Sequence, residues 1–315
     1  MTSGHDRPRV VRHFVLPGTL RGKLHAWRFV IARRSVQIAT LLLFFGTLHW
    51  GWKIAGRPLL AGNLSASELL GAIPLADPFA ALQILASGHR PGREVLTGAA
   101  IVLAVYLLLG GRVFCAWVCP MNIVTDTAAW LRQRLGLSGR PDLLRLPVYT
   151  RQILLALALV LSALAGLPAF EAFSPIGMLH RELLYGLGWG LAGAGGILLL
   201  DTFVMHRGWC GHLCPLGAFW GLLARLPRLG QLQVGFDAAS CTRCGDCIKA
   251  CPEPRVLNLP ELARHGRVAG GDCTRCGRCV AVCPESSLRF DLLMRIRPAT
   301  AATAAGSSPL AGENP

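Results

Sequence analysis

The sequence lacks the motifs with which many redox proteins hold a haem or a nucleotide. No C-x-x-C-H occurs, which excludes a covalently attached c-type haem. Neither G-x-x-x-x-G-K-[ST] nor a G-x-G-x-x-G after a strand occurs, so no nucleotide-binding loop is predicted. The first 34 residues are polar and basic and contain no early apolar core, so no cleavable signal peptide is predicted either.

Charged residues are also scarce, at 16% of 315 residues, whereas hydrophobic residues make up 52%. This balance is typical of a membrane protein. Acidic residues number 17 and basic residues 32, which gives a formal net charge of +15. The basic residues flank apolar runs and form no continuous basic face. The charge therefore indicates Lys and Arg retained on the cytoplasmic side, and no nucleic-acid partner is predicted.

Four apolar runs are long enough to cross a bilayer as helices. Each contains 17 or more residues without a charge, and none alternates with the period of two that is typical of strands. The runs are Ser35–Trp52, Val95–Gly111, Gln152–Phe170 and Leu183–Leu200, the last of which is expected to continue to Met205. The sequence therefore predicts an all-α polytopic domain with four transmembrane helices.

Basic residues set the orientation of these helices. The stretch before the first run holds eight Lys and Arg and one acid, and the 112–151 loop holds six against two. The positive-inside rule then places both termini and the 112–151 loop in the cytoplasm. The 57–94 and 171–182 loops are expected to face the periplasm. The predicted location is a bacterial inner membrane, crossed several times.

All twelve cysteines fall into four groups, of which two are quartets. Residues 241–252 read CTRCGDCIKACP and residues 273–284 read CTRCGRCVAVCP. Both are C-x-x-C-x-x-C-x-x-x-C-P, the bacterial ferredoxin run for [4Fe–4S] clusters. Three thiolates on a tight loop reach one cube, and the fourth cysteine, before proline, reaches the other. The predicted ligands are Cys241, Cys244, Cys247 and Cys283 for one cluster, and Cys251, Cys273, Cys276 and Cys279 for the other.

Structural zinc is the competing interpretation of the quartets, because C-x-x-C pairs alone would permit it. Two complete quartets with both trailing prolines favour clusters, and two adjacent clusters indicate electron transfer. The predicted organisation is a basic N-terminus (1–34), the membrane domain (35–235) and a two-cluster, ferredoxin-like α+β domain (236–297) that needs its clusters for stability. The tail (298–315), rich in Ala, Gly, Ser and Pro, is expected to be disordered.

The other two cysteine groups are matched pairs. Residues 113–120 read VFCAWVCP and residues 208–215 read GWCGHLCP, each after an apolar run. On a helix the i, i+4 spacing places both sulfurs on one face, and the proline predicts a break. The candidate catalytic groups are therefore Cys115, Cys119, Cys210 and Cys214. They either converge into a four-thiolate site for a further metal or form two redox dithiols.

The repeated position of these pairs, after the second and the fourth run, predicts a duplicated unit of span, loop, span and cysteine pair. Small buried residues at helix ends would not account for this repetition.

Without a nucleotide or haem site, electrons must enter from a membrane-bound donor or from another protein. A quinol is the obvious membrane donor, and its oxidation needs proton acceptors near the membrane surface. Candidates on the periplasmic side, each of which is also interpretable as a solvated loop residue, are His49, Asp77, His89, Glu171, His180, Arg181 and Glu182. Asp201 lies inside the last apolar run, where a charge is costly. It either has a function or pairs with His206 or Arg207.

These features together resemble a known family. The four spans, the two C-x-x-x-C-P motifs and the two ferredoxin runs are similar to the ferredoxin-type membrane proteins that include NapH, NosR and MauN. The segments PLADPFAALQILASGHRP (74–91), FCAWVCP, HRGWCGHLCP and CIKACPEPRVL resemble the NapH type most. The likeness runs from about residue 30 to residue 290, and every cysteine of the pattern is present.

The resemblance implies a component of a quinol dehydrogenase that takes electrons from ubiquinol or menaquinol. It implies a periplasmic iron–sulfur protein of the NapG type as acceptor, with a c-type cytochrome and nitrate reductase downstream. Three alternatives stay open. They are the same role in another pathway, such as methylamine dehydrogenase; a redox maturation or assembly factor whose cysteine pairs bind or deliver a metal; and a membrane anchor without turnover.

Overall fold

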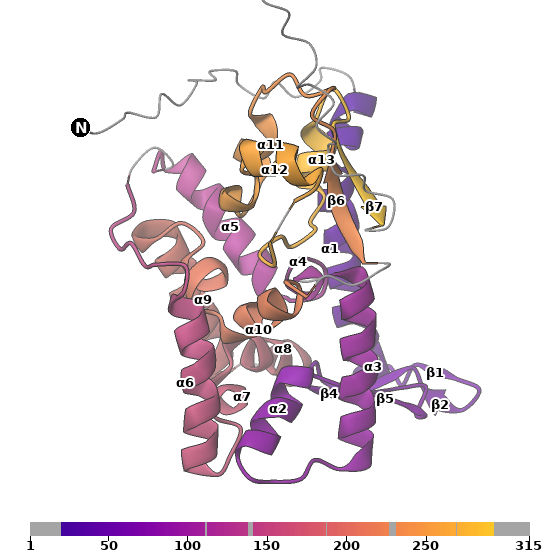
Figure 1. Ribbon diagram of the computed structural model, residues 1–315. Coiled ribbons are helices and arrows are strands. Elements are labelled where there is room, and N and C mark those ends of the chain that lie inside the picture. Colours follow the sequence, from indigo (N-terminus) through magenta and orange to yellow (C-terminus); the bar gives the residue numbers. More distant parts are fainter. Residues whose placement is uncertain are drawn as a thin grey trace, which may run out of the picture.

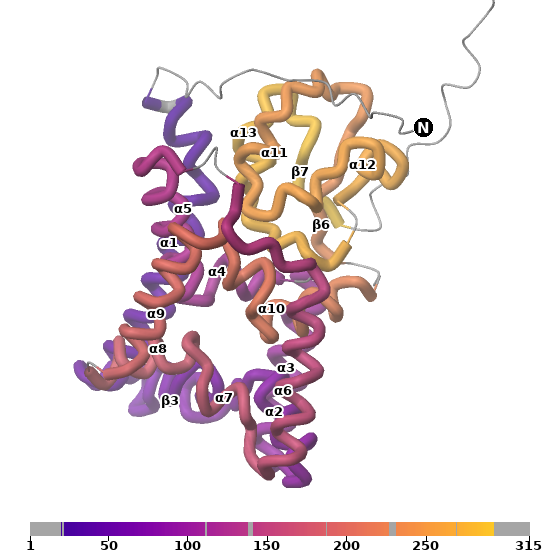
Figure 2. Tube along the Cα trace, turned by 90° about the vertical axis from the view of Figure 1, so that its left-hand side faces the viewer, coloured from indigo at the N-terminus to yellow at the C-terminus, as the bar shows by residue number. Residues whose placement is uncertain are grey.

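The computed structural model describes residues 20–110, 112–137, 141–186, 188–226, 231–268 and 270–292. Two parts stack on one another (Figures 1 and 2). A helical part forms one end, and a small unit of helices and strands, built from the last of the described residues, covers the other end. Most of the basic N-terminus, up to residue 19, and the tail 298–315 lie outside the described residues.

Each of the four apolar runs contributes a helix, but with different bounds. The helices are α1 (Leu20–His49), α3 (Arg93–Leu109), α6 (Thr150–Ala165) and α9 (Trp189–Leu199), the last continued by a π-helical turn, η1 (Leu200–Val204). Within the described residues, one segment, Gly22–His49, is long and apolar enough to cross a membrane. At 16 residues, α6 is about 24 Å long, somewhat less than a hydrocarbon core of about 30 Å.

Helix α1 begins well before Ser35, where the first span was expected to begin. Arg33 and Arg34, which the sequence suggested as the charged boundary of the span, lie inside the helix. Both pair with Asp126, and the Arg33 side chain is 1% exposed. A charge inside an apolar helix is tolerated because it is paired within the protein.

The fourth expected span, Leu183–Leu200, is broken in the structure. Its first residues belong to α8 (Pro175–Tyr185), which ends at Gly186 with φ +119°, a conformation that favours glycine. Helix α9 then begins after Gly188 and packs against α8. Glu182 caps the start of α9, because its carboxylate accepts hydrogen bonds from the backbone N–H groups of Gly190 and Leu191.

The 57–94 loop contains strands, which the expectation of an all-α membrane domain missed. A hairpin pairs β1 (Lys53–Ile54) with β2 (Arg57–Pro58). A three-stranded antiparallel sheet follows, and its strands are β3 (Leu60–Gly62), β4 (Ala66–Leu69) and β5 (Ile73–Ala76). Strand β5 leads into α2 (Pro78–Ala86) and lies against α3 at Gly98. A Cβ atom on Gly98 would lie 2.9 Å from the Ala76 nitrogen, so only glycine allows this approach.

The remaining helices of the helical part connect these elements. They are α4 (Val113–Trp117), α5 (Met121–Arg134), α7 (Ala169–Phe173), a π-helical turn η2 (Trp209–Leu213) and α10 (Pro215–Leu223). A core cluster that includes Phe79 and Trp220 holds them together.

The C-terminal unit has the predicted ferredoxin-like α+β character. Strand β6 (Leu232–Phe236) pairs antiparallel with β7 (Leu288–Leu292), and β6 lies across the expected domain boundary at residue 236. Between the strands lie α11 (Asp246–Ala250), a short 3-10 helix η3 (Pro254–Val256), α12 (Leu259–His265) and α13 (Arg278–Val282). Their apolar core is small, with Val234, Leu262 and Leu288 at its centre.

A single carboxylate, Asp126 on α5, ties the two parts together. Its oxygens pair with four arginines from three parts of the chain: Arg33 and Arg34 on α1, Arg207, and Arg278 on α13. The Asp126 side chain is 8% exposed, and the positive charge around it lowers its pKa although burial alone would raise it. The network therefore fixes the position of the C-terminal unit on the helical part.

Replacing Asp126 with asparagine is expected to destabilise the protein by about 3–5 kcal/mol, because buried arginines then face one another without their counter-charge. Asp142→Asn is the matched control. Asp142 pairs with Arg132 but is 32% exposed, so its loss should cost about 1 kcal/mol. Thermal unfolding of both purified variants measures the difference. Equal unfolding temperatures would contradict the role assigned to Asp126.

Candidate functional site

The eight quartet cysteines line two separate hollows in the C-terminal unit. The first hollow, of about 370 Å³, contains Cys241, Cys244, Cys247 and Cys283. The second hollow, of about 340 Å³, contains Cys251, Cys273, Cys276 and Cys279. These are the two sets that the crosswise pattern of the sequence predicts. In each hollow, three cysteines come from one run and the fourth from the other run.

The local backbone explains why the sulfurs gather in this way. Arg243 and Arg275, in the middle of each first C-x-x-C, have φ values of +55° and +51°, and Gly245 and Gly277 have φ values of +80° and +75°. These left-handed residues fold each loop tightly around its hollow. The fourth cysteine of each run, before its proline, is extended rather than helical. It therefore leaves its own loop and reaches the other hollow.

The pKa of a quartet thiol is raised by burial and by cysteines that line the same hollow. Burial, followed by the neighbouring Cys244, raises the pKa of Cys247 to about 11. Burial, followed by Cys276, raises the pKa of Cys251. Four cysteines line each hollow, three from one run and one from the other, which is the ligand set of a [4Fe–4S] cluster.

The C-x-x-x-C-P cysteines converge in the core of the helical part, and we call these four residues the four-thiol core. Its members are Cys115, Cys119, Cys210 and Cys214, and none of them forms a disulfide. Cys119 and Cys214 are buried in one apolar cluster, and Cys115 packs against it. Burial, then Cys115, Cys210 and Cys214, raises the pKa of Cys119, so all four lie in one neighbourhood.

The prolines break the helices as predicted. Helix α4 ends at Trp117 and α5 begins after Pro120. In the second pair, the π-helical turn η2 ends at Leu213, and Cys214 precedes Pro215 at the start of α10. The Cys214 sulfur accepts a hydrogen bond from the Gly217 N–H at 3.4 Å.

Two arginines accompany the four-thiol core. The sequence suggested Arg112 only as a topological charge and Arg207 only as a pairing partner of Asp201. Arg112 and Arg207 each stand three residues before the first cysteine of a pair, an R-x-x-C-x-x-x-C-P repeat that could have identified them. The Arg112 side chain is 1% exposed and donates to the Cys210 carbonyl at 2.6 Å. Burial alone would lower the pKa of Arg112, but Cys115 and Glu253 raise it. A cation buried this deeply needs negative charge beside it.

The four-thiol core adjoins the second hollow and not the first. Trp117, between Cys115 and Cys119, donates from its indole nitrogen to the Arg275 carbonyl at 3.2 Å. Arg275 lies in the loop of the second hollow. Arg112 also pairs with Glu253, which follows Cys251 and Pro252, at 3.5 Å. The two thiol sites are therefore joined by direct contacts.

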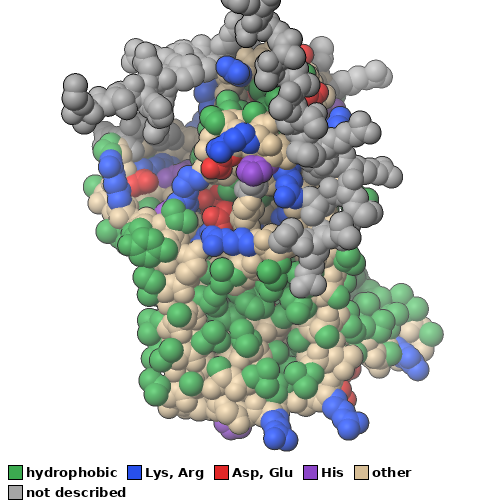
Figure 3. Space-filling model, viewed as in Figure 1, with side chains coloured by type: hydrophobic (Ala, Val, Ile, Leu, Met, Phe, Trp, Pro, Cys, Tyr) green, Lys and Arg blue, Asp and Glu red, His purple; other side chains and the backbone are tan. Residues whose placement is uncertain are grey.

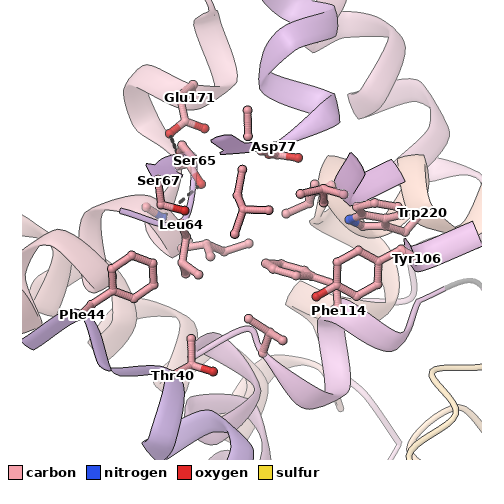
Figure 4. Close-up of a pocket in the computed structure, with 18 of the residues that line it drawn as sticks. Thr40, Phe44, Leu64, Ser65, Ser67, Asp77, Tyr106, Phe114, Glu171 and Trp220 are labelled. Atoms are coloured by element: carbon pink, nitrogen blue, oxygen red, sulfur yellow. Dashed lines mark hydrogen bonds between the residues drawn. The ribbon is translucent and has the colours of Figure 1, made fainter. Parts of the chain in front are cut away.

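A pocket of about 880 Å³ lies on the other side of the four-thiol core (Figure 4), and we call it the carboxylate pocket. Asp77 and Glu171 stand together at one end, and the Ser65 hydroxyl donates to Glu171. Phe44 faces Tyr106, Phe114 and Trp220 across the middle. Phe114 and Val118, which also line the pocket, are chain neighbours of Cys115 and Cys119.

Of the seven expected proton acceptors, only Asp77 and Glu171 line this pocket. His180 is buried against the Phe44 ring, with centroids 4.8 Å apart, and Glu182 caps α9. His49 hydrogen-bonds to the Leu184 carbonyl, and His89 to the Ser87 hydroxyl. Arg181 acts on the carboxylate of Glu171, whose pKa burial raises and Arg181 lowers.

Of the two alternatives that the sequence left open for Asp201, a function or a pairing with His206 or Arg207, the pairing is not present in the structure. Asp201 is buried in η1 and accepts a hydrogen bond from the Trp209 N–H at 3.0 Å. Arg207 pairs with Asp126 at 2.7 Å instead, and the His206 N–H donates to Asp142 at 2.9 Å. The turn between η1 and η2 brings the Asp201 carboxylate to the backbone of the second cysteine segment. Asp201 therefore positions that segment.

Two family models match the chain. One, described as a 4Fe-4S binding domain, matches twice, at residues 94–138 and 187–231. The other, described as a 4Fe-4S dicluster domain, matches residues 233–291. The double match supports the predicted duplication, although the repeated unit is helix, cysteine pair and helix. The first match contains Cys115 and Cys119, and the second contains Cys210 and Cys214. Both cysteine pairs of the four-thiol core thus lie in segments that match a 4Fe-4S binding domain.

Similar proteins cover most of the chain. The methylamine utilization ferredoxin-type protein MauN of Methylobacillus flagellatus is 43% identical over 76% of this chain and 81% of its own length. The ferredoxin-type protein NapH is 40% identical in Escherichia coli, over 77% of this chain and 81% of the relative, and 40% identical in Haemophilus influenzae, over 76% and 80%. No solved structure matches the chain. The protein is an iron–sulfur electron-transfer protein that belongs to the family of ferredoxin-type proteins NapH and MauN.

Proposed function

We propose that the protein is the membrane component of a quinol dehydrogenase, which takes electrons from ubiquinol or menaquinol and passes them to two [4Fe–4S] clusters. Clusters held in the two hollows would supply one-electron transfer. The observation that carries the proposal is the pair of contacts that Trp117 and Arg112 make between the four-thiol core and the second hollow. These contacts would give electrons a short path from the helical part to one cluster. They therefore favour electron transfer over a role as an anchor alone.

Exposed apolar surface supports the proposed four-span topology. Figure 3 shows hydrophobic side chains over the helical part, with charges gathered toward the C-terminal unit and a few Lys and Arg at the far edge. Large apolar side chains on α3 and α6 are exposed, namely Leu96, Val105, Leu108, Leu109, Ile153, Leu157, Val160, Leu161 and Leu164. Such a surface is covered by lipid in a membrane protein.

The proposed orientation has both ends of the chain in the cytoplasm of a bacterium. The N-terminal part of α1 packs on the C-terminal unit, where the Phe29 and Phe290 ring centroids lie 5.4 Å apart. The two ends of the described chain therefore face the same side. The strands of the 57–94 loop, α2 and α7 lie toward the opposite side, which would be the periplasm (Figure 1). Asp77 precedes α2, and Glu171 lies on α7.

We also propose that the four-thiol core holds a metal or an iron–sulfur cluster. A metal–thiolate centre is anionic and would supply the negative charge that the buried Arg112 needs. The family description of residues 94–138 and 187–231 agrees with this assignment. Two free dithiols would leave Arg112 with Glu253 as its ionic partner, at 3.5 Å.

Nitrate reduction is the proposed pathway, because residues 74–91 resemble the NapH type. A NapG-like periplasmic iron–sulfur protein would then accept the electrons, with a c-type cytochrome and nitrate reductase downstream. The similarity to MauN gives methylamine oxidation equal standing as an alternative. A neighbouring gene for either terminal enzyme would decide between the two pathways.

The test is anaerobic reduction of the purified protein in nanodiscs. We expect decyl-ubiquinol or menadiol to reduce the clusters, as followed by EPR. Clusters that dithionite reduces but that ignore both quinols would reject a quinol as the donor. Bound copper in that preparation would favour the maturation factor. Normal nitrate reduction in a strain lacking all eight quartet cysteines would favour the anchor.

A further inference from the structure

We infer that the carboxylate pocket is the quinol oxidation site, with Asp77 as the group that accepts a proton from the quinol hydroxyl. This inference rests on the proposed function and adds the location and the chemistry of the site. The pocket joins a carboxylate pair, Asp77 and Glu171, to Phe114 and Val118, the chain neighbours of Cys115 and Cys119.

The pocket has a lining that suits a quinone head group. Its walls are mostly apolar, and a minority of its side chains are polar. Aromatic rings stand on both sides: Phe44 on one wall, and Tyr106 and Trp220, with centroids 5.0 Å apart, on the other (Figure 4). A planar ring can stack between such walls.

The two carboxylates stand at one end of the pocket, and the Thr40 hydroxyl lies away from them (Figure 4). Asp77 precedes α2, lines the pocket and accepts the Phe79 N–H at 3.0 Å. Glu171, on α7, is held by Ser65. One end of the pocket is thus suited to the hydroxyl of a quinol, and the apolar remainder to its ring.

The two ends separate protons from electrons. Oxidation of one quinol to quinone releases two protons and two electrons. Asp77 and Glu171 accept the protons at the end toward the 57–94 loop. The electrons would leave past Phe114 and Val118, the chain neighbours of Cys115 and Cys119, and two oxidised clusters held in the hollows would each accept one of them.

The proton affinity of Asp77 suits this role. Burial, and then the facing carboxylate of Glu171, raises its pKa to about 7, against the hydrogen bond from Phe79. Tyr106 is the other titratable group that faces it. The carboxyl group is protonated below this pH and can accept a proton only above it. Quinol-dependent reduction should therefore accelerate as pH rises through about 7.

Binding is tested with full-length protein in nanodiscs and an azido-quinone photolabel, mapped by mass spectrometry and competed with decyl-ubiquinone. Val102 lines the pocket, whereas Val105, one turn along α3, is 48% exposed on the outer face. Val102→Phe should reduce labelling of the pocket segments at least about tenfold. Val105→Phe should label like the wild type. Leu64→Trp fills the pocket from the opposite wall and should reduce labelling in the same way. Because the two variants change different elements, a folding defect in one of them does not decide the test.

Catalysis is tested with Asp77→Asn, which keeps the cap of α2 because asparagine caps helices as well as aspartate does. It should keep photolabelling but slow quinol-dependent cluster reduction at least about 100-fold and abolish its rise with pH. Glu68→Gln, on the neighbouring strand β4, is the control and should behave as the wild type. Dithionite reduction should be equal in all variants.

The outcomes separate the two hypotheses. A wild-type protein whose clusters ignore quinol would reject the proposed function. A quinol-reducible wild type with undiminished labelling in both Val102→Phe and Leu64→Trp would place the quinol elsewhere. Lost labelling in these variants combined with a wild-type rate and pH profile in Asp77→Asn would overturn the role of Asp77.

Discussion

The double variant Cys251→Ala/Cys276→Ala is expected to keep one cluster, whereas Cys276→Ala/Cys283→Ala should lose both. In the structure, Cys251 and Cys276 line the second hollow and Cys283 lines the first. The first variant therefore damages one site twice, and the second damages each site once. The iron held by the quartets should fall from about eight atoms per chain to about four in the first variant, and to nearly none in the second.

Alanine is chosen because its methyl group cannot replace a thiolate ligand. The single variant Cys244→Ala or Cys276→Ala should lose about four irons and lower the unfolding temperature of the C-terminal unit, since its small apolar core depends on the bound clusters. Iron analysis and EPR of the dithionite-reduced proteins measure both effects. If Cys251→Ala/Cys276→Ala lost both clusters and Cys276→Ala/Cys283→Ala kept one, each run would hold its own cluster. That result would contradict crosswise ligation.

Spacing alone predicted the two hollows because a cluster site is a local feature. The quartets, their glycines and their trailing prolines determine the loop conformation within a dozen residues. The helix breaks after Cys119 and Cys214 were predictable for the same reason, since proline cannot continue a helix. Such features follow from the chain itself and need little help from distant segments.

The buried ionic contacts could not be predicted in this way. Asp126 meets arginines that lie more than eighty residues away in either direction, and sequence alone could only count them as charges on one side of the membrane. Asp77 and Glu171 were two of seven equal candidates until β5 and α7 brought them to one pocket. The break at Gly186 was hidden because an apolar run has no periodicity that distinguishes one span from a hairpin.

Replacing Cys115 or Cys214 with serine is expected to stop quinol-dependent cluster reduction, by at least about 100-fold, while both clusters stay intact. The four-thiol core lies between the carboxylate pocket and the second hollow, so its loss interrupts the path without touching a ligand of either hollow. Serine is close to cysteine in size, which limits the change in packing around the buried Cys214.

The measurement compares two reductants on each variant. Iron analysis should find about eight irons per chain in the quartets of each variant. Dithionite should then give the full EPR signal, whereas the quinol should give no signal within the time of wild-type reduction. Arg112→Leu, which removes the buried cation but no sulfur, should lower any metal content of the four-thiol core more than that of the two hollows. A wild-type rate with quinol in Cys115→Ser and Cys214→Ser would remove the four-thiol core from the electron path, and the contacts of Trp117 and Arg112 would then serve only to hold the C-terminal unit in place.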